Sequence, residues 1–215
     1  MSEARPKPEP KTLWRGSIEA LTADPSFGPV VERVGAVKMP VSEEPPFVYL
    51  ARAIVFQQLA GRAARTIHGR FVEAMRGEVT PARVLRASEG TLRGAGLSGN
   101  KMAALRDLAA KTRSREVALD DLEALSDEAI VDRLTRVRGI GPWTAQMFLM
   151  FRLHRPDVWP AGDLGVRNGF AKIHGMDPMP TEKELLPLGE KYRPWRSAAA
   201  WYCWRAVEIE LPQVG

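Results

Sequence analysis

The chain has 215 residues, 45% of them hydrophobic, which is enough for one large domain or two small lobes around a core. Its formal net charge of +5 favours a polyanionic partner only modestly. The single cysteine, Cys203, excludes an intrachain disulfide, a four-cysteine zinc site and a cysteine-ligated iron–sulfur cluster. No apolar run approaches the roughly 20 residues of a membrane span. We therefore expect a cytoplasmic protein with no membrane contact.

The elements are expected to be helical almost throughout. Residues 1–11 are polar and proline-rich and predict a disordered arm, and residues 12–215 form the folded domain. Helix starts are predicted at Asp24-Pro25, at Pro45-Pro46 before Phe47–Ala60, at Thr80-Pro81, at Ser98, at Ser126 and at Thr181, where Glu184 completes a capping box. The last helix is expected over Trp195–Ile209. Only Pro29–Val41 resembles a strand, and it reads equally well as a helix broken by glycines. The fold class is all-α.

The segment 134–145 combines two helices with a tight turn, Gly139-Ile140-Gly141. The first helix is expected to end near Val137 and the second to begin near Pro142, because proline suits the first turn of a helix. Unpaired backbone N–H groups of such a turn carry partial positive charge and suit a phosphate oxygen. Taken alone, Gly-x-Gly is also typical of an ordinary helix connection with a glycine C-cap.

Asp163 follows a loop rich in proline and glycine and precedes a helical stretch over 164–173. Its spacing favours a helix N-cap, since aspartate there satisfies free N–H groups. A cap also fixes the carboxylate in place, so a structural role and a chemical role are compatible.

The string 137–145, Val-Arg-Gly-Ile-Gly-Pro-Trp-Thr-Ala, followed by Asp-Val-Trp-Pro-Ala-Gly-Asp at 157–163, resembles the helix-hairpin-helix DNA glycosylases. Within them the chain is most similar to the DNA-3-methyladenine glycosylase II group. The resemblance runs from about Pro45 to Glu208. It implies a two-lobed all-α fold with the active-site cleft between lobes. It also implies a monomeric base-excision repair enzyme that acts on double-stranded DNA containing alkylated bases, nucleoid-associated in a bacterium.

The resemblance also implies roles for individual residues. Asp163 matches the family's catalytic aspartate, which stabilises positive charge on the sugar as the N-glycosidic bond breaks. The expected pocket for the extruded base consists of Trp143, Trp195, Trp159 and Phe47. The expected DNA contacts are Gln57 and Gln58 at the wedge, with Arg138, Gly139, Ile140, Gly141 and Thr144 at the hairpin.

Family members that also cut the strand use a lysine on the second hairpin helix, and Trp143 stands at the matching place here. We therefore expect base removal without lyase activity. No cofactor is expected to be required, although the carbonyl groups of Thr135, Val137 and Ile140 are the nearest matches to a Na⁺ or K⁺ site of the family. Two alternatives stay open: a glycosylase for another lesion class, and a non-catalytic DNA-binding module.

Overall fold

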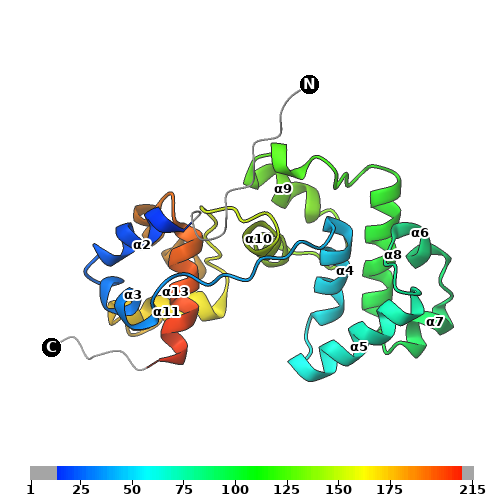
Figure 1. Ribbon diagram of the computed structural model, residues 1–215, viewed down its shortest axis with the longest axis horizontal. Coiled ribbons are helices and arrows are strands. Elements are labelled where there is room, and N and C mark those ends of the chain that lie inside the picture. The colour runs from blue at the N-terminus through cyan, green and yellow to red at the C-terminus, as the bar shows by residue number, and fades with distance from the viewer. Residues whose placement is uncertain (1–13, 210–215) are drawn as a thin grey trace. The chain divides into compact units, whose positions relative to one another are not determined.

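The computed structural model describes residues 14–209, so the predicted arm at residues 1–11 lies outside the described residues. The described chain contains helices and no strand, as Figure 1 shows. In chain order the α-helices are α2 (Arg15–Thr22), α3 (Gly28–Val34), α4 (Pro46–Phe56), α5 (Gly61–Ala74), α6 (Pro81–Arg86), α7 (Glu89–Gly94), α8 (Gly99–Arg113), α9 (Asp127–Leu134), α10 (Pro142–Phe151), α11 (Leu164–His174), α12 (Glu182–Leu188) and α13 (Arg196–Glu208). Short 3-10 turns occur at Leu122–Ala124 and Glu190–Tyr192.

The chain divides into two compact units. Unit 1 combines Met1–Val41 with His154–Gly215, and unit 2 is Ser42–Leu153. Unit 1 therefore contains α2, α3 and α11–α13, while unit 2 contains α4–α10. Each unit has its own buried apolar residues: Phe27 and Phe170 in unit 1, and Leu50, Leu105 and Phe148 in unit 2, are at most 2% exposed.

Capping side chains mark half of the α-helix starts in residues 14–209, including four of the predicted ones. The side chains of Thr80, Ser98 and Ser126 each accept a hydrogen bond from the backbone N–H three residues later. Thr181 and Glu184 form the predicted capping box at the start of α12. These starts are predictable because both partners of each bond lie within one helical turn.

Three local predictions need correction. Asp24-Pro25 opens a turn rather than a helix: the Asp24 carboxylate accepts hydrogen bonds from the N–H groups of Ser26 and Phe27, and α3 begins only at Gly28. The predicted helix Phe47–Ala60 ends at Phe56, since the chain turns away at Gln57 and Gln58 has a positive φ of 57°. The strand alternative for 29–41 is wrong, because its first part is α3.

In unit 1, α11 and α13 lie in direct backbone contact. A Cβ atom on Gly169 would stand 1.9 Å from the carbonyl oxygen of Cys203, so only glycine permits this approach. Beside α11, an aromatic cluster with mostly edge-to-face ring contacts is formed by Phe27, Trp159, Phe170, His174 and Tyr192. The close approach at Gly169 thus holds α11 against α13, and the aromatic cluster packs on α11.

In unit 2, α8 is the central helix. It packs against α4 and α6, and Figure 1 shows these two helices on different sides of it. Leu105, Leu108 and Ala109 of α8 are fully buried. The helix therefore provides a rigid support for the α9–α10 connection, which rests on it through the contacts described next.

Candidate functional site

The predicted hairpin is present, with its turn between α9 and α10. Helix α9 ends at Leu134, somewhat earlier than predicted, and α10 begins at Pro142 as predicted. Gly139 has a φ of +79°, and a Cβ atom there would stand 3.2 Å from the Ala104 side chain. Glycine is therefore required both for the left-handed backbone and for the approach to α8.

Three side chains from outside the hairpin hold its turn. The Asp107 carboxylate accepts a hydrogen bond from the N–H of Arg138 at 2.7 Å, and Lys111 donates to the carbonyl of Arg136 at 2.5 Å. Gln57 donates through Nε2 to the carbonyl of Gly139 at 2.8 Å. Asp107 and Lys111 also pair with each other at 3.1 Å, one turn apart on α8. We call Gln57, Asp107 and Lys111 the hairpin clamp.

Only some of the turn's N–H groups lack a partner in residues 14–209. The Ile140 N–H donates to the Val137 carbonyl at 3.0 Å, and the Arg138 N–H just before the turn donates to Asp107. The N–H groups of Gly139 and Gly141 make no hydrogen bond with any residue of 14–209 and remain available to an anion. Burial favours a raised pKa for Asp107, but the Arg138 N–H and the Lys111 ammonium together lower the pKa, so the carboxylate stays charged.

A cavity of about 670 Å³ opens beside the hairpin in unit 2. Its lining residues are Tyr49, Arg52, Ala53, Phe56, Gln57, Gln58, Trp143, Thr144, Met147 and Phe151. Two helix faces supply most of them: one turn apart on α10 are Trp143, Met147 and Phe151, and on α4 are Tyr49, Ala53 and Phe56. The predicted residues Gln57, Gln58, Trp143 and Thr144 thus share one cavity.

Trp143 is 49% exposed although it lines this cavity, which is unusual for so large an apolar side chain. The Arg52 guanidinium lies 5.0 Å from the centre of the Tyr49 ring and pairs with Glu44 at 2.8 Å. Burial raises the pKa of Tyr49 to about 12, so its phenol is neutral. The cavity wall is therefore aromatic, and its one guanidinium is balanced by a carboxylate.

In unit 1, Asp163 is the N-cap of α11. Its Oδ1 accepts hydrogen bonds from the Val166 N–H at 2.9 Å and from the indole Nε1–H of Trp204 at 2.8 Å. A Cβ atom on Gly165 would stand 2.8 Å from the Trp204 ring, so the indole covers the first turn of α11. The structure confirms the predicted cap, and two donors hold the carboxylate in one orientation.

Sequence reasoning missed Trp204 as a partner of Asp163. The sequence contains little that indicates this contact, because predicting it requires knowing that α13 crosses α11 at Gly169. The same reasoning missed Tyr49, Phe56 and Phe151 in the cavity of unit 2. The spacing could have indicated them, because Tyr49 and Phe56, like Trp143 and Phe151, lie two helical turns apart on one helix face.

The other predicted pocket residues lie elsewhere. Phe47 is 7% exposed and packs in the core of unit 2. Trp159 is 5% exposed, donates to the Leu185 carbonyl and packs on Phe170, so its placement is that of a core residue. Trp195 is half-buried against Gly16, where a Cβ atom would stand 2.8 Å from the indole. Their roles as base contacts stay predictions, and the packing of Phe47 and Trp159 argues against those roles.

Neither metal binding by side chains nor a membrane span is indicated in the described chain. Residues 14–209 contain no group of three His, Cys, Asp or Glu side chains arranged to hold a metal ion. No helix in this range is long and apolar enough to cross a membrane. The cation site at the carbonyl groups of Thr135, Val137 and Ile140 stays a prediction; the Val137 carbonyl accepts the Ile140 N–H at 3.0 Å.

Comparison with known proteins agrees with this geometry. Residues 51–194 match the HhH-GPD superfamily of base excision DNA repair proteins, and the chain belongs to this family. It is 34% identical to DNA-3-methyladenine glycosylase 1 of Schizosaccharomyces pombe over 203 residues, which are 92% of this chain and 89% of the relative.

Two solved structures are similar over most of the chain. One is the S. pombe 3-methyladenine DNA glycosylase in complex with abasic DNA, with a TM-score of 0.80 and 34% identity, covering 90% of this chain and 97% of that one. The other is a DNA-3-methyladenine glycosidase from Bacillus halodurans, with a TM-score of 0.75 and 31% identity, covering 86% and 90%. The all-helical family fold is confirmed.

Proposed function

We propose that this protein is a monofunctional DNA glycosylase that flips alkylated bases, 3-methyladenine first among them, out of double-stranded DNA and hydrolyses their N-glycosidic bond. The observation that carries this proposal is the Asp163 carboxylate, which caps α11 and is oriented by Val166 and Trp204. The names of the relatives, which are 3-methyladenine glycosylases, support the choice of substrate.

The reaction needs one fixed carboxylate. Breaking the bond between C1′ and the base nitrogen leaves positive charge on the sugar, and both bonding electrons depart with the base. A carboxylate held in a preset orientation stabilises that charge and can accept a proton from the attacking water. An alkylated purine is already cationic, so it leaves as a neutral base without strong acid assistance. Asp163 alone therefore meets the chemical requirement.

The cavity of unit 2 is the proposed receptor for the extruded base. Its volume of about 670 Å³ is ample for a purine. An electron-poor methylated base is attracted to the faces of electron-rich rings such as Trp143 and Tyr49. Gln57 and Gln58 border the same cavity, and the left-handed backbone of Gln58 is a strained conformation of the kind found at functional positions.

The absence of lyase activity is part of the proposal. Strand cleavage needs an amine that attacks C1′, and Trp143 stands where bifunctional relatives carry lysine. Two lysines of unit 1 are engaged elsewhere: Lys172 donates to the Ile209 carbonyl, and Lys191 pairs with Asp24 at 3.0 Å. Borohydride treatment with abasic-site DNA should leave no covalent adduct. A trapped protein–DNA imine would contradict this part.

The main test is base release from methylated duplex DNA, with the products identified by chromatography. We expect wild type to release 3-methyladenine in the presence of a chelator, because no cofactor is required. Asp163→Asn keeps both hydrogen bonds to Oδ1, so it should fold and bind DNA but release base about a hundredfold more slowly. The control is Asp120→Asn, which removes a charge from an exposed pair with Arg115. Equal rates for wild type and Asp163→Asn would overturn the proposal. Release from a duplex that contains an oxidised base, with none from methylated DNA, would favour the alternative lesion class.

A further inference from the structure

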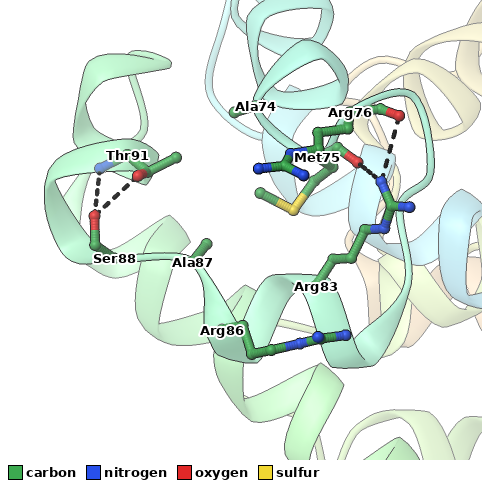
Figure 2. Close-up of a pocket in the computed structure, with 8 residues that line it drawn as sticks. All are labelled: Ala74, Met75, Arg76, Arg83, Arg86, Ala87, Ser88 and Thr91. Atoms are coloured by element: carbon green, nitrogen blue, oxygen red, sulfur yellow. Dashed lines mark hydrogen bonds between the residues drawn. The ribbon is translucent and has the colours of Figure 1, made fainter.

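A second cavity, of about 600 Å³, lies in unit 2 between the end of α5 and the helices α6 and α7. Figure 2 shows its lining residues: Ala74, Met75, Arg76, Arg83, Arg86, Ala87, Ser88 and Thr91. No residue lines both this cavity and the aromatic one beside the hairpin. In Figure 1, α6 and α7 lie on the other side of α8 from α4. The proposed glycosylase reaction makes no use of this cavity.

Three arginines from two segments share the cavity, and only Arg83 has a carboxylate partner among residues 14–209. Arg83 pairs with Glu78 and donates to the carbonyl groups of Met75 and Arg76, so it holds the end of α5 against α6. The Arg83 guanidinium is therefore engaged in contacts within unit 2. The cavity keeps two further guanidinium groups, those of Arg76 and Arg86.

The guanidinium of Arg76 makes no hydrogen bond or ion pair with any residue of 14–209. Arg86 uses only Nε, which donates to the Ala82 carbonyl at 3.2 Å, and its two Nη groups are unpaired in the same range. Figure 2 shows Arg76 directed into the space that Ser88 and Thr91 border from the other side. Arg76 and Arg86 thus bring two positive charges without a carboxylate partner in residues 14–209 to the lining of one cavity, and an anion bound there would neutralise them.

The backbone at Arg76 adds an independent observation. Arg76 has a φ of 52°, in the left-handed region that a long side chain rarely adopts. The conformation is fixed because the carbonyl groups of Met75 and Arg76 are both bound by Arg83. The result is a preset direction for the Arg76 side chain at the rim of the cavity.

We propose that this cavity is a binding site for a phosphate group, held by Arg76 and Arg86 with the free O–H of the Ser88–Thr91 pair as a further donor. Guanidinium groups bind phosphate oxygens through paired N–H donors, and hydroxyls complete such sites. The Ser88 and Thr91 hydroxyls are hydrogen-bonded to each other at 2.9 Å, so one O–H of the pair remains to donate to a ligand. The phosphate is supplied either by the backbone of bound DNA or by a free phosphate compound.

The test uses a double variant and a matched control. Arg76→Gln with Arg86→Gln removes both unpaired guanidinium groups and leaves Arg83 and its bonds intact. Arg93→Gln with Arg115→Gln removes the same charge from exposed residues that pair with Glu89 and Asp120 and do not line the cavity. Thermal unfolding of both proteins shows whether either change affects the fold.

Inorganic phosphate is titrated against the full chain at constant ionic strength, with chloride as reference, and arginine side-chain N–H signals are followed by nuclear magnetic resonance. We expect wild type and the control to bind phosphate and the double variant to bind about tenfold more weakly or worse. In a second arm, the affinity for an undamaged duplex is measured against salt concentration.

The two arms separate the two sources of phosphate. If DNA supplies it, the slope of log affinity against log salt falls in the double variant by about 0.9 for each DNA phosphate that the protein no longer neutralises, beyond any change in the control. If a free compound supplies it, phosphate binding is lost while the slope matches the control. The proposal is overturned if the double variant equals the control in both arms, and this outcome leaves base excision by Asp163 unaffected.

Discussion

The indole Nε1–H of Trp204 donates a hydrogen bond to Oδ1 of Asp163 at 2.8 Å, across two helices that touch at Gly169. Two donors, one from the backbone of α11 and one from α13, therefore orient the carboxylate on which the proposed chemistry depends. Helix packing in unit 1 and the reactivity of Asp163 are linked through this bond.

Replacing Trp204 with phenylalanine removes the N–H donor and keeps most of the ring. We expect single-turnover excision of 7-methylguanine to slow by about tenfold, because hydrogen bonds to charged groups contribute roughly 1.5–3 kcal/mol. Duplex affinity should not change. Trp201→Phe, on the same helix but 7% exposed in the core, is the control for ring loss. Equal slowing in both variants would show that Trp204 acts only through stability.

Trp143→Ala should separate catalysis from stability. Since this side chain is 49% exposed, its loss should leave the thermal midpoint within a few degrees of wild type. The cavity loses an aromatic wall, so we expect excision to fall at least about tenfold, more than duplex affinity does. Phe47→Ala, which empties a core position, should show the opposite pattern, with a lowered midpoint. A larger loss of affinity than of excision rate would place Trp143 in DNA binding instead.

The effect of Asp107→Ala on DNA affinity distinguishes two explanations, because they predict changes in opposite directions. Simple electrostatics predicts tighter DNA binding when a negative charge is removed. The hairpin clamp predicts weaker binding, by about threefold to tenfold, because the Arg138 N–H loses its acceptor and the turn loosens. Fluorescence anisotropy with an undamaged duplex decides between them. Asp120→Ala, which removes the same charge from the exposed surface, measures the electrostatic effect alone.

His174 predicts a pH dependence of stability. Its Nδ1 donates to the Phe170 carbonyl, and its Nε2 accepts from the Tyr192 hydroxyl, both at 2.9 Å. Burial lowers the pKa of His174 below 6.5, while Lys191 and Asp24 act on it in opposite directions. The unfolded chain then takes up the proton at higher pH than the folded chain, so the free energy of unfolding decreases as pH falls below about 6.5.

Urea unfolding at a series of pH values between about 5 and 7.5 tests this dependence. His174→Gln should reduce the loss of stability between the two ends of the range. Burial also lowers the pKa of His68. A separate substitution of His68 measures its own contribution to the pH dependence of stability. An unchanged pH profile in His174→Gln would contradict the prediction. The carboxylates with lowered pKa, such as Asp24, affect stability only at more acidic pH.

Two glycine-to-alanine changes should shift stability in opposite directions. Gly169→Ala places a methyl group 1.9 Å from the Cys203 carbonyl oxygen, so α11 and α13 must separate, at a cost of about 3 kcal/mol or more. Gly69 lies within α5, and a Cβ atom there would have no neighbour within 4 Å, so Gly69→Ala should stabilise by about 0.5–1 kcal/mol. Calorimetry measures both. Because Asp163 and Trp204 depend on the same helix contact, Gly169→Ala should also slow excision.

The sequence by itself determined the features whose partners are neighbours in the chain. The caps at Ser98, Ser126, Thr181 and Asp163 each depend on hydrogen bonds that close within one helical turn, and residue type alone marks the turn at Gly139 and the helix start at Pro142. Residue type and spacing are then sufficient evidence. Resemblance to a family added the chemical meaning of Asp163, which spacing alone did not contain.

Only the tertiary structure decided which distant side chains meet these features. Trp204 is 41 residues from Asp163, Asp107 is 31 from Arg138, and Gln57 is 82 from Gly139. Helical periodicity identifies the buried face of each helix, but the packing of one helix on another selects which residue of that face lies opposite a given atom. For this reason the sequence predicted the hairpin and the aspartate, whereas the clamp, the indole that orients Asp163 and the arginine-lined cavity became visible only in the folded chain.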